Sequence, residues 1–261
     1  MRLTYVKGQN HRAVLLLEAM TRRDTESRSA CASTEALERL LSSHAGASKI
    51  DLSWLRDRAG TSQVTHAAGT DITPEVCQTS ALLVCRGWVA NGAVLNDGRR
   101  QIISVHLAGD FLRAPDQGGG DVNIWALTPA ATVEAGALWR DLETGSCPSV
   151  PLQQAWISLR ATERARVAQH IVRLGRLSAY ERCAHFFLEL HDKQLRNGLG
   201  TAGAVLLPLS QDVLADLLGL SAVHINRTLQ QLRRDGLIAY SEGRVLLPDL
   251  PGLTRAACIT P

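Results

Sequence analysis

The chain has 261 residues, of which 45% are hydrophobic and 20% are charged, and its formal net charge is +3. This is an ordinary globular composition, long enough for two domains that bury their cores without disulfides. It excludes a membrane-spanning protein, because no apolar stretch approaches the length of a membrane span. A weakly basic charge permits nucleic acid as a partner without arguing for it, so that case depends on local charge.

The cysteines and the N-terminus indicate a reduced cytosolic protein. No two cysteines form a Cys-x-x-Cys pair, and we expect most of them to be small core residues. They are Cys31, Cys77, Cys85, Cys147, Cys183 and Cys258. The short apolar run at 13–17 is interrupted by Glu18, which does not fit a signal peptide. We therefore expect a soluble, cytoplasmic protein.

Residues 1–60 read as an N-terminal extension, partly helical or disordered. The segment after Met20 is polar, so either Met1 or Met20 is the true start. Ser33 is placed to cap a short helix, and three leucines share one face of it. These are Leu37, Leu40 and Leu41.

Residues 61–148 read as a small antiparallel β-roll. Short runs rich in β-branched residues are separated by turn residues, and Asp97-Gly98 is a strong hairpin signal. Many short strands at this spacing are typical of a barrel or roll. The runs are 63–65, 82–85, 88–90, 101–105 and 131–133.

Residues 149–176 are predicted to form a long helix with an apolar stripe. Such a helix between two domains often pairs with its copy in a dimer. The alternative is a helix packed only on its own domain. The residues expected in the dimer contact are Trp156, Leu159, Val167, Ile171 and Leu174.

Residues 177–261 carry a helix-turn-helix pattern. Ser178 and Glu181 form a capping box that starts a helix. Farther on, small Ala215 lets two helices approach, Gly219 accepts the left-handed turn conformation, and apolar Ile225 fills the space between them.

The second helix of this pattern, about 221–234, is basic and contains no acid. Two short runs around 241–243 follow it and predict a β-hairpin wing. The alternative is a helical hairpin with a solvated charged face. The caps, basic side chains and wing together predict contacts with DNA by Ser210, Ser221, His224, Arg227, Arg233, Arg234 and Arg244.

The segment LPLSQDVLADLLGLSAVHINRTLQQLRRDGLI resembles the DNA-binding domain of the Crp/Fnr regulators. GRLSAYERCAHFFLEL resembles the helix that opens that domain, and NDGRRQIISVHLAGDF resembles the family's cyclic-nucleotide-binding β-roll. The resemblance implies an α+β fold: an N-terminal jelly roll, a long dimerisation helix and a C-terminal winged helix-turn-helix. It also implies a homodimer on a pseudo-palindromic operator in double-stranded DNA, with RNA polymerase as a further partner.

The resemblance also implies a reading face on the second helix. Family members carry Glu, a small polar residue and Arg where this chain has Val223, Asn226 and Arg227. Arg227 is suited to bond guanine, whereas Val223 offers only methyl groups. Val223 either contacts a thymine methyl or packs against the neighbouring helix.

The effector is left unknown, because this chain departs from the family's ligand motifs. Nucleotide-binding members carry a Gly-Glu pair and a downstream Arg-Ser or Arg-Thr pair. Here Gly109-Asp110 is followed by no Gly-Glu, Gly120-Asp121 lies where the arginine pair belongs, and Arg113 stands at the wrong end of the loop. Cys31 alone cannot hold an iron–sulfur cluster. His66 and His106 are more simply surface or core residues than haem ligands, so we predict no cofactor or metal.

Two further functions remain as alternatives. One is a cyclic-nucleotide-responsive regulator with an atypical pocket. The other, an enzyme, is not expected, because acids flank the glycines at 118–120 and would repel phosphate, and His185 and His191 do not share a helix face.

Overall fold

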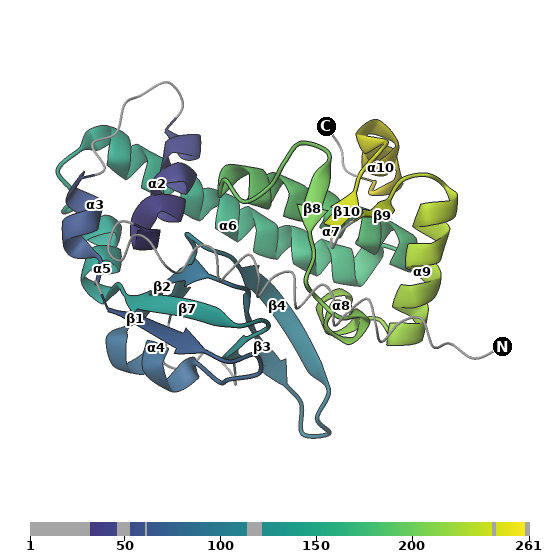
Figure 1. Ribbon diagram of the computed structural model, residues 1–261, viewed down its shortest axis with the longest axis horizontal. Helices are drawn as coiled ribbons and strands as arrows, with labels where there is room; N and C mark the ends of the chain where they lie inside the picture. The colour runs from purple at the N-terminus through teal and green to yellow at the C-terminus, as the bar shows by residue number, and fades with distance from the viewer. Residues whose placement is uncertain (1–31, 46–52, 61, 114–121, 242–243, 259–261) are drawn as a thin grey trace. The chain divides into compact units, whose positions relative to one another are not determined.

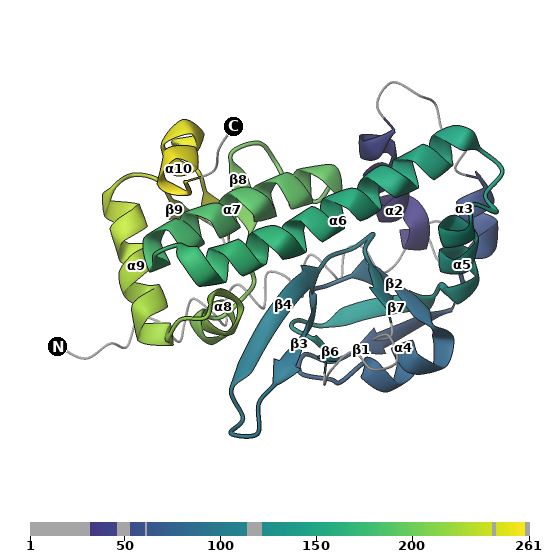
Figure 2. The same ribbon diagram turned by 180° about the vertical axis from the view of Figure 1, so that it is seen from behind.

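The computed structural model describes residues 32–45, 53–60, 62–113, 122–241 and 244–258. Their packing divides them into two compact units (Figures 1 and 2). The N-terminal unit extends to Val172 and includes residues 196–198, and the C-terminal unit contains residues 173–195 and 199 onward.

The described part of the N-terminal unit holds two antiparallel sheets, as the alternation of short strands and turns predicts. One sheet has the order β1(Gln63–His66), β7(Ala130–Glu134), β2(Ala81–Arg86), β5(Phe111–Arg113), and the other β4(Arg100–His106), β3(Val89–Val94), β6(Val122–Ala126). Strands β5 and β6 were not predicted, nor were helices α4 (Thr73–Thr79) and α5 (Gly136–Thr144). Helix α5 has no side-chain cap at Ala135, so it lacks the usual start signal in the sequence.

Helices α2 (Ala32–His44) and α3 (Ser53–Arg58) belong to the core of this unit. Leu37, Leu40, Leu41 and Leu55 are fully buried in the same cluster as strand β2 and helix α5. The boundary drawn at residue 60 is therefore wrong for this part of the chain, because these leucines have no core of their own. The starts at Met1 and Met20 and the site of Cys31 lie outside the described residues.

Helix α6 (Val150–Arg176) turns one face of its first half into this core. Leu152, Ala155, Trp156 and Leu159 are buried there, and Trp156 packs edge-to-face against Trp139 and Phe111. Trp156 and Leu159 are thus not available for a dimer contact. Of the other residues predicted for it, Val167 and Ile171 are exposed and Leu174 is half-buried.

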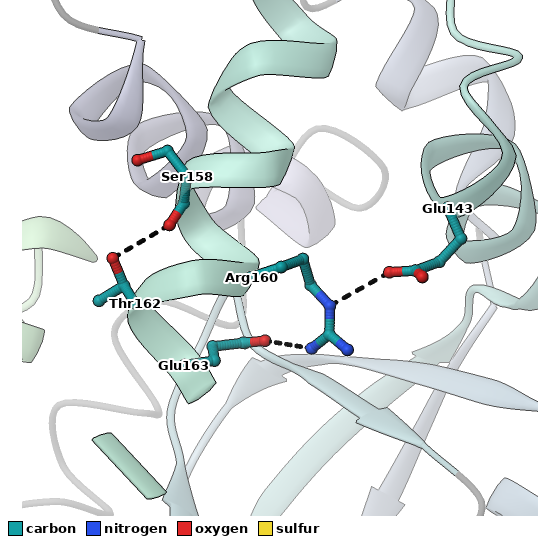
Figure 3. A network of polar contacts seen from close by, with 5 residues as sticks. All are labelled: Glu143, Ser158, Arg160, Thr162 and Glu163. Atoms are coloured by element: carbon teal, nitrogen blue, oxygen red, sulfur yellow. Dashed lines mark hydrogen bonds and ion pairs between the residues drawn. The ribbon is translucent and has the colours of Figure 1, made fainter. Parts of the chain in front are cut away.

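A polar network holds that face of α6 inward. Figure 3 shows the Arg160 guanidinium directed toward Glu143 of α5, 3.1 Å away, and also paired with Glu163. The same guanidinium lies over the ring of Trp139, 4.7 Å from its centroid. Because these contacts hold this side of α6 against the core of the N-terminal unit, the opposite side of the helix faces solvent or a partner.

The C-terminal unit contains α7 (Ala179–Arg196, whose last residue groups with the N-terminal unit), β8 (Ala204–Leu206), α8 (Gln211–Leu218), α9 (Ala222–Arg234), β9 (Ala239–Ser241), β10 (Arg244–Leu246) and α10 (Leu250–Ala256). The three strands pair antiparallel in the order β8, β10, β9. Strand β8, which has only three residues and follows Gly203, was not predicted. No helix in the described part of the chain is long and apolar enough to cross a membrane.

Candidate nucleic-acid interface

Helices α8 and α9 form the helix-turn-helix that the sequence predicts. Ser210 Oγ accepts the Val213 N–H at 3.3 Å, and Ser221 Oγ accepts the His224 N–H at 3.2 Å, so both serines are N-caps. Gly219 ends α8 with φ 62° and donates its N–H to the Ala215 carbonyl. This left-handed turn needs a residue without Cβ strain, as the motif requires.

Helix α9 has an inner and an outer face. Ile225, Thr228, Leu229 and Leu232 are buried. The opposite side chains recur at helical spacing and are exposed; they are Val223, Arg227, Gln230 and Arg234. Val223 is 81% exposed, so the alternative in which it packs against the neighbouring helix is wrong.

Asn226 is engaged within the motif. Its Nδ2 donates to Gln211 Oε1 at 3.1 Å, and its Oδ1 accepts from Gln230 Nε2 at 2.9 Å. The half-buried amide therefore connects the first residue of α8 with the outer face of α9. Sequence reasoning missed both glutamines. The position of Gln230, four residues after Asn226, was the available signal.

Cations surround this face. Arg227 bonds to none of the described residues, whereas the Arg233 guanidinium lies 5.4 Å from the centroid of the Tyr240 ring, at the start of the wing. Arg234 donates to Gln231 at 2.9 Å, and Arg244 of β10 donates to Thr201 at 3.4 Å. Among the described residues, none of these four guanidinium groups forms an ion pair with a carboxylate.

His224 is exposed in the first turn of α9. It stands one residue after Val223 and its own N–H is already taken by the Ser221 cap. The predicted DNA contacts thus lie in α9, in β10 and at the N-caps of α8 and α9, and all of them belong to the C-terminal unit.

In the N-terminal unit, the segment around Asp110, where the effector motif was sought, forms hydrogen bonds that hold the local backbone. Asp110 Oδ2 accepts the Leu107 N–H at 2.8 Å, and Asn197 donates to the Ala108 carbonyl and to Asp110 Oδ1. Gly109 has φ 94°, and a Cβ there would meet Ala36 backbone atoms at 2.8 Å. Asp110 therefore builds a turn, and the glycines at 118–120 and Asp121 lie outside the described residues.

The remaining candidate ligands are also engaged. Arg113 lies over the Trp139 ring, 4.8 Å from its centroid. His66 Nε2 bonds Thr132 Oγ1 at 2.9 Å, and burial lowers the pKa of His66, which keeps the ring neutral. His106 is half-buried. Among the residues described, no group of three His, Cys, Asp or Glu side chains could hold a metal ion.

Residues 181–256 match the model of the Crp-like helix-turn-helix domain. The chain is 32% identical over 207 residues to the nitrogen fixation regulation protein FixK of Bradyrhizobium diazoefficiens, covering 77% of this chain and 85% of that protein. It is 30% identical over 175 residues to FixK of Rhizobium meliloti, covering 65% and 76%. The chain belongs to the Crp/Fnr family of transcription regulators, which bind DNA through this helix-turn-helix.

Solved structures show the same fold. FixK2 from Bradyrhizobium japonicum superposes with a TM-score of 0.62 at 24% identity, covering 78% of this chain and 99% of that one. A mutant of CooA from Carboxydothermus hydrogenoformans gives 0.57 at 16% identity, covering 80% and 92%. The predicted α+β fold of a roll followed by a helix-turn-helix is therefore confirmed.

Proposed function

We propose that this regulator binds a pseudo-palindromic operator as a homodimer, with one α9 helix in the major groove of each half-site. The observation that carries this proposal is the outer face of α9, which presents on one side exposed Val223, the Asn226–Gln230 amide pair and Arg227, which bonds to none of the described residues. A recognition helix places such side chains against base edges. The assignment of residues 177–261 as the DNA-binding domain is part of the proposal.

In this proposal Arg227 reads guanine by bonding O6 and N7, which discriminates by about 1–3 kcal/mol. Val223 meets a thymine methyl, because it is exposed and cannot hydrogen bond. Asn226 acts together with Gln230, since its amide is already bonded, and Gln230 extends the reading face by one turn. Gln211 holds Asn226 in place from α8.

The other predicted contacts serve the phosphates. Arg233, Arg234 and Arg244 flank the reading face as cations, and His224 lies at its start. Ser210 and Ser221 use a lone pair in capping, and each keeps a hydroxyl hydrogen for a phosphate oxygen.

Selection from randomised DNA tests this assignment. Val223→Glu should move selection toward cytosine at one position of each half-site, because a carboxylate accepts from cytosine N4. Arg227→Ala should remove specific binding and leave weak, salt-sensitive binding. If Arg227→Ala still selects the wild-type sequence, α9 does not read bases through this face.

For the homodimer, we propose the outward stripe of α6 as the seam. Exposed residues recur along it with alternating spacings of four and three, the repeat of a coiled coil. They are Ile157, Ala161, Arg164, Ala168, Ile171 and Gly175. Val167 flanks this seam, and half-buried Leu174 lies near its end. The stripe lies opposite Trp156 and Leu159, which face the roll core.

We further propose that cyclic AMP does not control the protein. The Gly-Glu pair is missing from the sequence, Asp110 is committed to a turn, and Arg113 is stacked on Trp139. Calorimetry that finds micromolar binding together with a change in operator affinity would refute this. We also propose that the protein has no enzymatic activity. In this proposal it acts on RNA polymerase at promoters, in the cytoplasm.

A further inference from the structure

The first turn of α7 bonds to several separate parts of the C-terminal unit through three consecutive side chains, Tyr180, Glu181 and Arg182. We propose that this turn, here named the α7 clamp, fixes the recognition helix to the last turn of α6 and thereby sets the spacing between operator half-sites. The inference rests on the homodimer proposed above. It assigns positioning roles to residues outside the reading face.

Arg182 binds the ends of two helices at once. Its Nη2 donates to the Leu174 carbonyl at 2.8 Å and its Nε to the Leu177 carbonyl at 2.8 Å, at the end of α6. Its Nη1 donates to the Leu218 carbonyl at 3.0 Å and approaches that of Gly219 at 3.4 Å, in the turn before α9. Terminal carbonyls lack partners within their helices and carry partial negative charge, so a guanidinium is well suited to cap both.

Tyr180 binds the C-terminal end of the recognition helix. Its hydroxyl donates to Asp235 Oδ2 at 2.7 Å, and Asp235 is the C-cap residue of α9. Gln231 of α9 also donates to this carboxylate, at 2.8 Å to Oδ1. The hydrogen bond from Tyr180 lowers the pKa of Asp235, so the carboxylate remains charged and accepting at neutral pH.

Glu181 adds a third attachment. Its carboxylate accepts the Ser178 N–H at 2.7 Å, as the capping box predicts, and the Cys258 thiol donates to its other oxygen at 3.0 Å. Cys258 follows the end of α10. The clamp therefore bonds the end of α6, the turn before α9, the end of α9 and the residue beyond α10.

An ion pair connects helices α6 and α7. Arg173, in the last turn of α6, pairs with Glu189 of α7 and is only 1% exposed. A buried arginine that lost this partner would be strongly destabilising, so the last turn of α6 is fixed to α7. Because α7 in turn bonds the turn before α9 and the C-cap residue of α9, the recognition helix cannot tilt against the last turn of α6 without breaking bonds of the clamp.

In a homodimer that pairs along α6, this attachment determines the separation of the two recognition helices. Half-site spacing is then a geometric property of the clamp, whereas base preference belongs to the outer face of α9. Loosening the clamp should relax spacing and leave base preference intact. A merely stabilising role would weaken binding to every operator alike.

The test uses the full chain and a DNA library of two wild-type half-sites separated by spacers of different length. The variants are Tyr180→Phe, which removes only one hydroxyl, Arg182→Lys, which keeps charge but not the planar fork of donors, and the double variant. The control is Arg255→Lys, an exposed arginine of α10 outside the clamp.

We expect wild type and Arg255→Lys to prefer one spacer strongly. In the double variant, the preference for that spacer over its neighbours should fall by about tenfold, roughly the effect of one hydrogen bond. Selected bases within each half-site should not change. Circular dichroism and sedimentation establish that each variant is folded and has the wild-type oligomeric state. If Arg182→Lys does not fold, the spacer preference of Tyr180→Phe alone still tests the clamp.

Different results would contradict the clamp inference and the homodimer proposal, so the two failures can be told apart. If wild type prefers one spacer and folded, dimeric variants keep that preference, the clamp does not set spacing and the inference is overturned. If wild type is a monomer in sedimentation, the homodimer itself is overturned and the clamp inference falls with it. If wild type is dimeric but binds all spacers equally, the clamp inference alone is overturned.

Discussion

Substitutions on the two sides of α6 should have different effects, even at positions close together in the sequence. Ile157 is 55% exposed on the proposed seam, whereas Leu159 is 2% exposed in the core of the N-terminal unit. Ile157→Lys should therefore produce a folded monomer, and Leu159→Lys should unfold the N-terminal unit. Ile171→Lys, at 66% exposure on the same stripe, should behave like Ile157→Lys.

The size of the seam effect follows from exposed apolar area. Complete burial of an isoleucine is worth about 1.5–3 kcal/mol, and only about half of Ile157 is available for burial, which leaves ~0.8–1.5 kcal/mol per copy. Two copies meet in the dimer, so the loss is about 1.5–3 kcal/mol, or a dissociation constant raised by roughly 10- to 140-fold. Removing the Leu159 side chain from its core costs about 2–5 kcal/mol of unfolding free energy even as alanine.

Sedimentation over a concentration series measures the first effect, and thermal unfolding followed by circular dichroism measures the second. Leu159→Ala serves as the matched variant, since it should lower the melting temperature without changing the dimer constant of the folded protein. A folded Ile157→Lys, Ile171→Lys double variant that stays dimeric would show that this face of α6 is not the interface.

Two further predictions concern the C-terminal unit. Arg244→Gln should weaken binding to all DNA sequences alike and reduce the slope of log affinity against log salt by about one; altered base preference with an unchanged slope would contradict a phosphate contact. Ser221→Ala removes the cap of α9 and should cost ~0.5–2 kcal/mol of unfolding free energy, whereas Ser221→Asn should recover most of it, as chemical denaturation can measure.

Local signals account for what the sequence predicted well. The caps Ser210 and Ser221 and the left-handed Gly219 each depend on a few adjacent residues, so their positions follow directly from the sequence. Strands bounded by turn residues were found for the same reason. Three-residue strands such as β5 and β8 carry too few residues for a period to show.

Contacts between distant segments were not predictable. Helix α6 carries two apolar stripes, and a single sequence cannot say which faces the roll; Trp156 and Ile157 are neighbours that point to different surroundings. Helices α2 and α3 looked like part of an extension because their partners, β2 and α5, lie far along the chain. The bond of Tyr180 to Asp235, 55 residues apart, likewise leaves no local pattern.

Burial of acidic groups in the C-terminal unit predicts a loss of stability in alkaline solution. Burial raises the pKa of the Cys183 thiol from 9.0 to about 12, although Arg182 and Arg173 oppose the shift. Burial, together with the hydrogen bond to Asp235, also raises the pKa of Tyr180 to about 12. Each group holds its proton more tightly when folded. Its stabilising contribution is therefore complete below the unfolded pKa and is lost as the pH rises toward 12.

Cys183 gives the sharpest test because it is only 1% exposed. In the unfolded chain its thiol also loses its proton at a lower pH than a tyrosine does. Above the ordinary thiol pKa, the unfolding free energy should fall by about 1.4 kcal/mol for each pH unit through this group alone. Between pH 8 and pH 10.5, wild type should lose ~2 kcal/mol more than Cys183→Ala, whose lower starting stability is set by its cavity and not by pH. Tyr180→Phe should differ from wild type in slope only above about pH 10. Parallel stability curves for wild type and Cys183→Ala over this range would show that the thiol is not held neutral by burial.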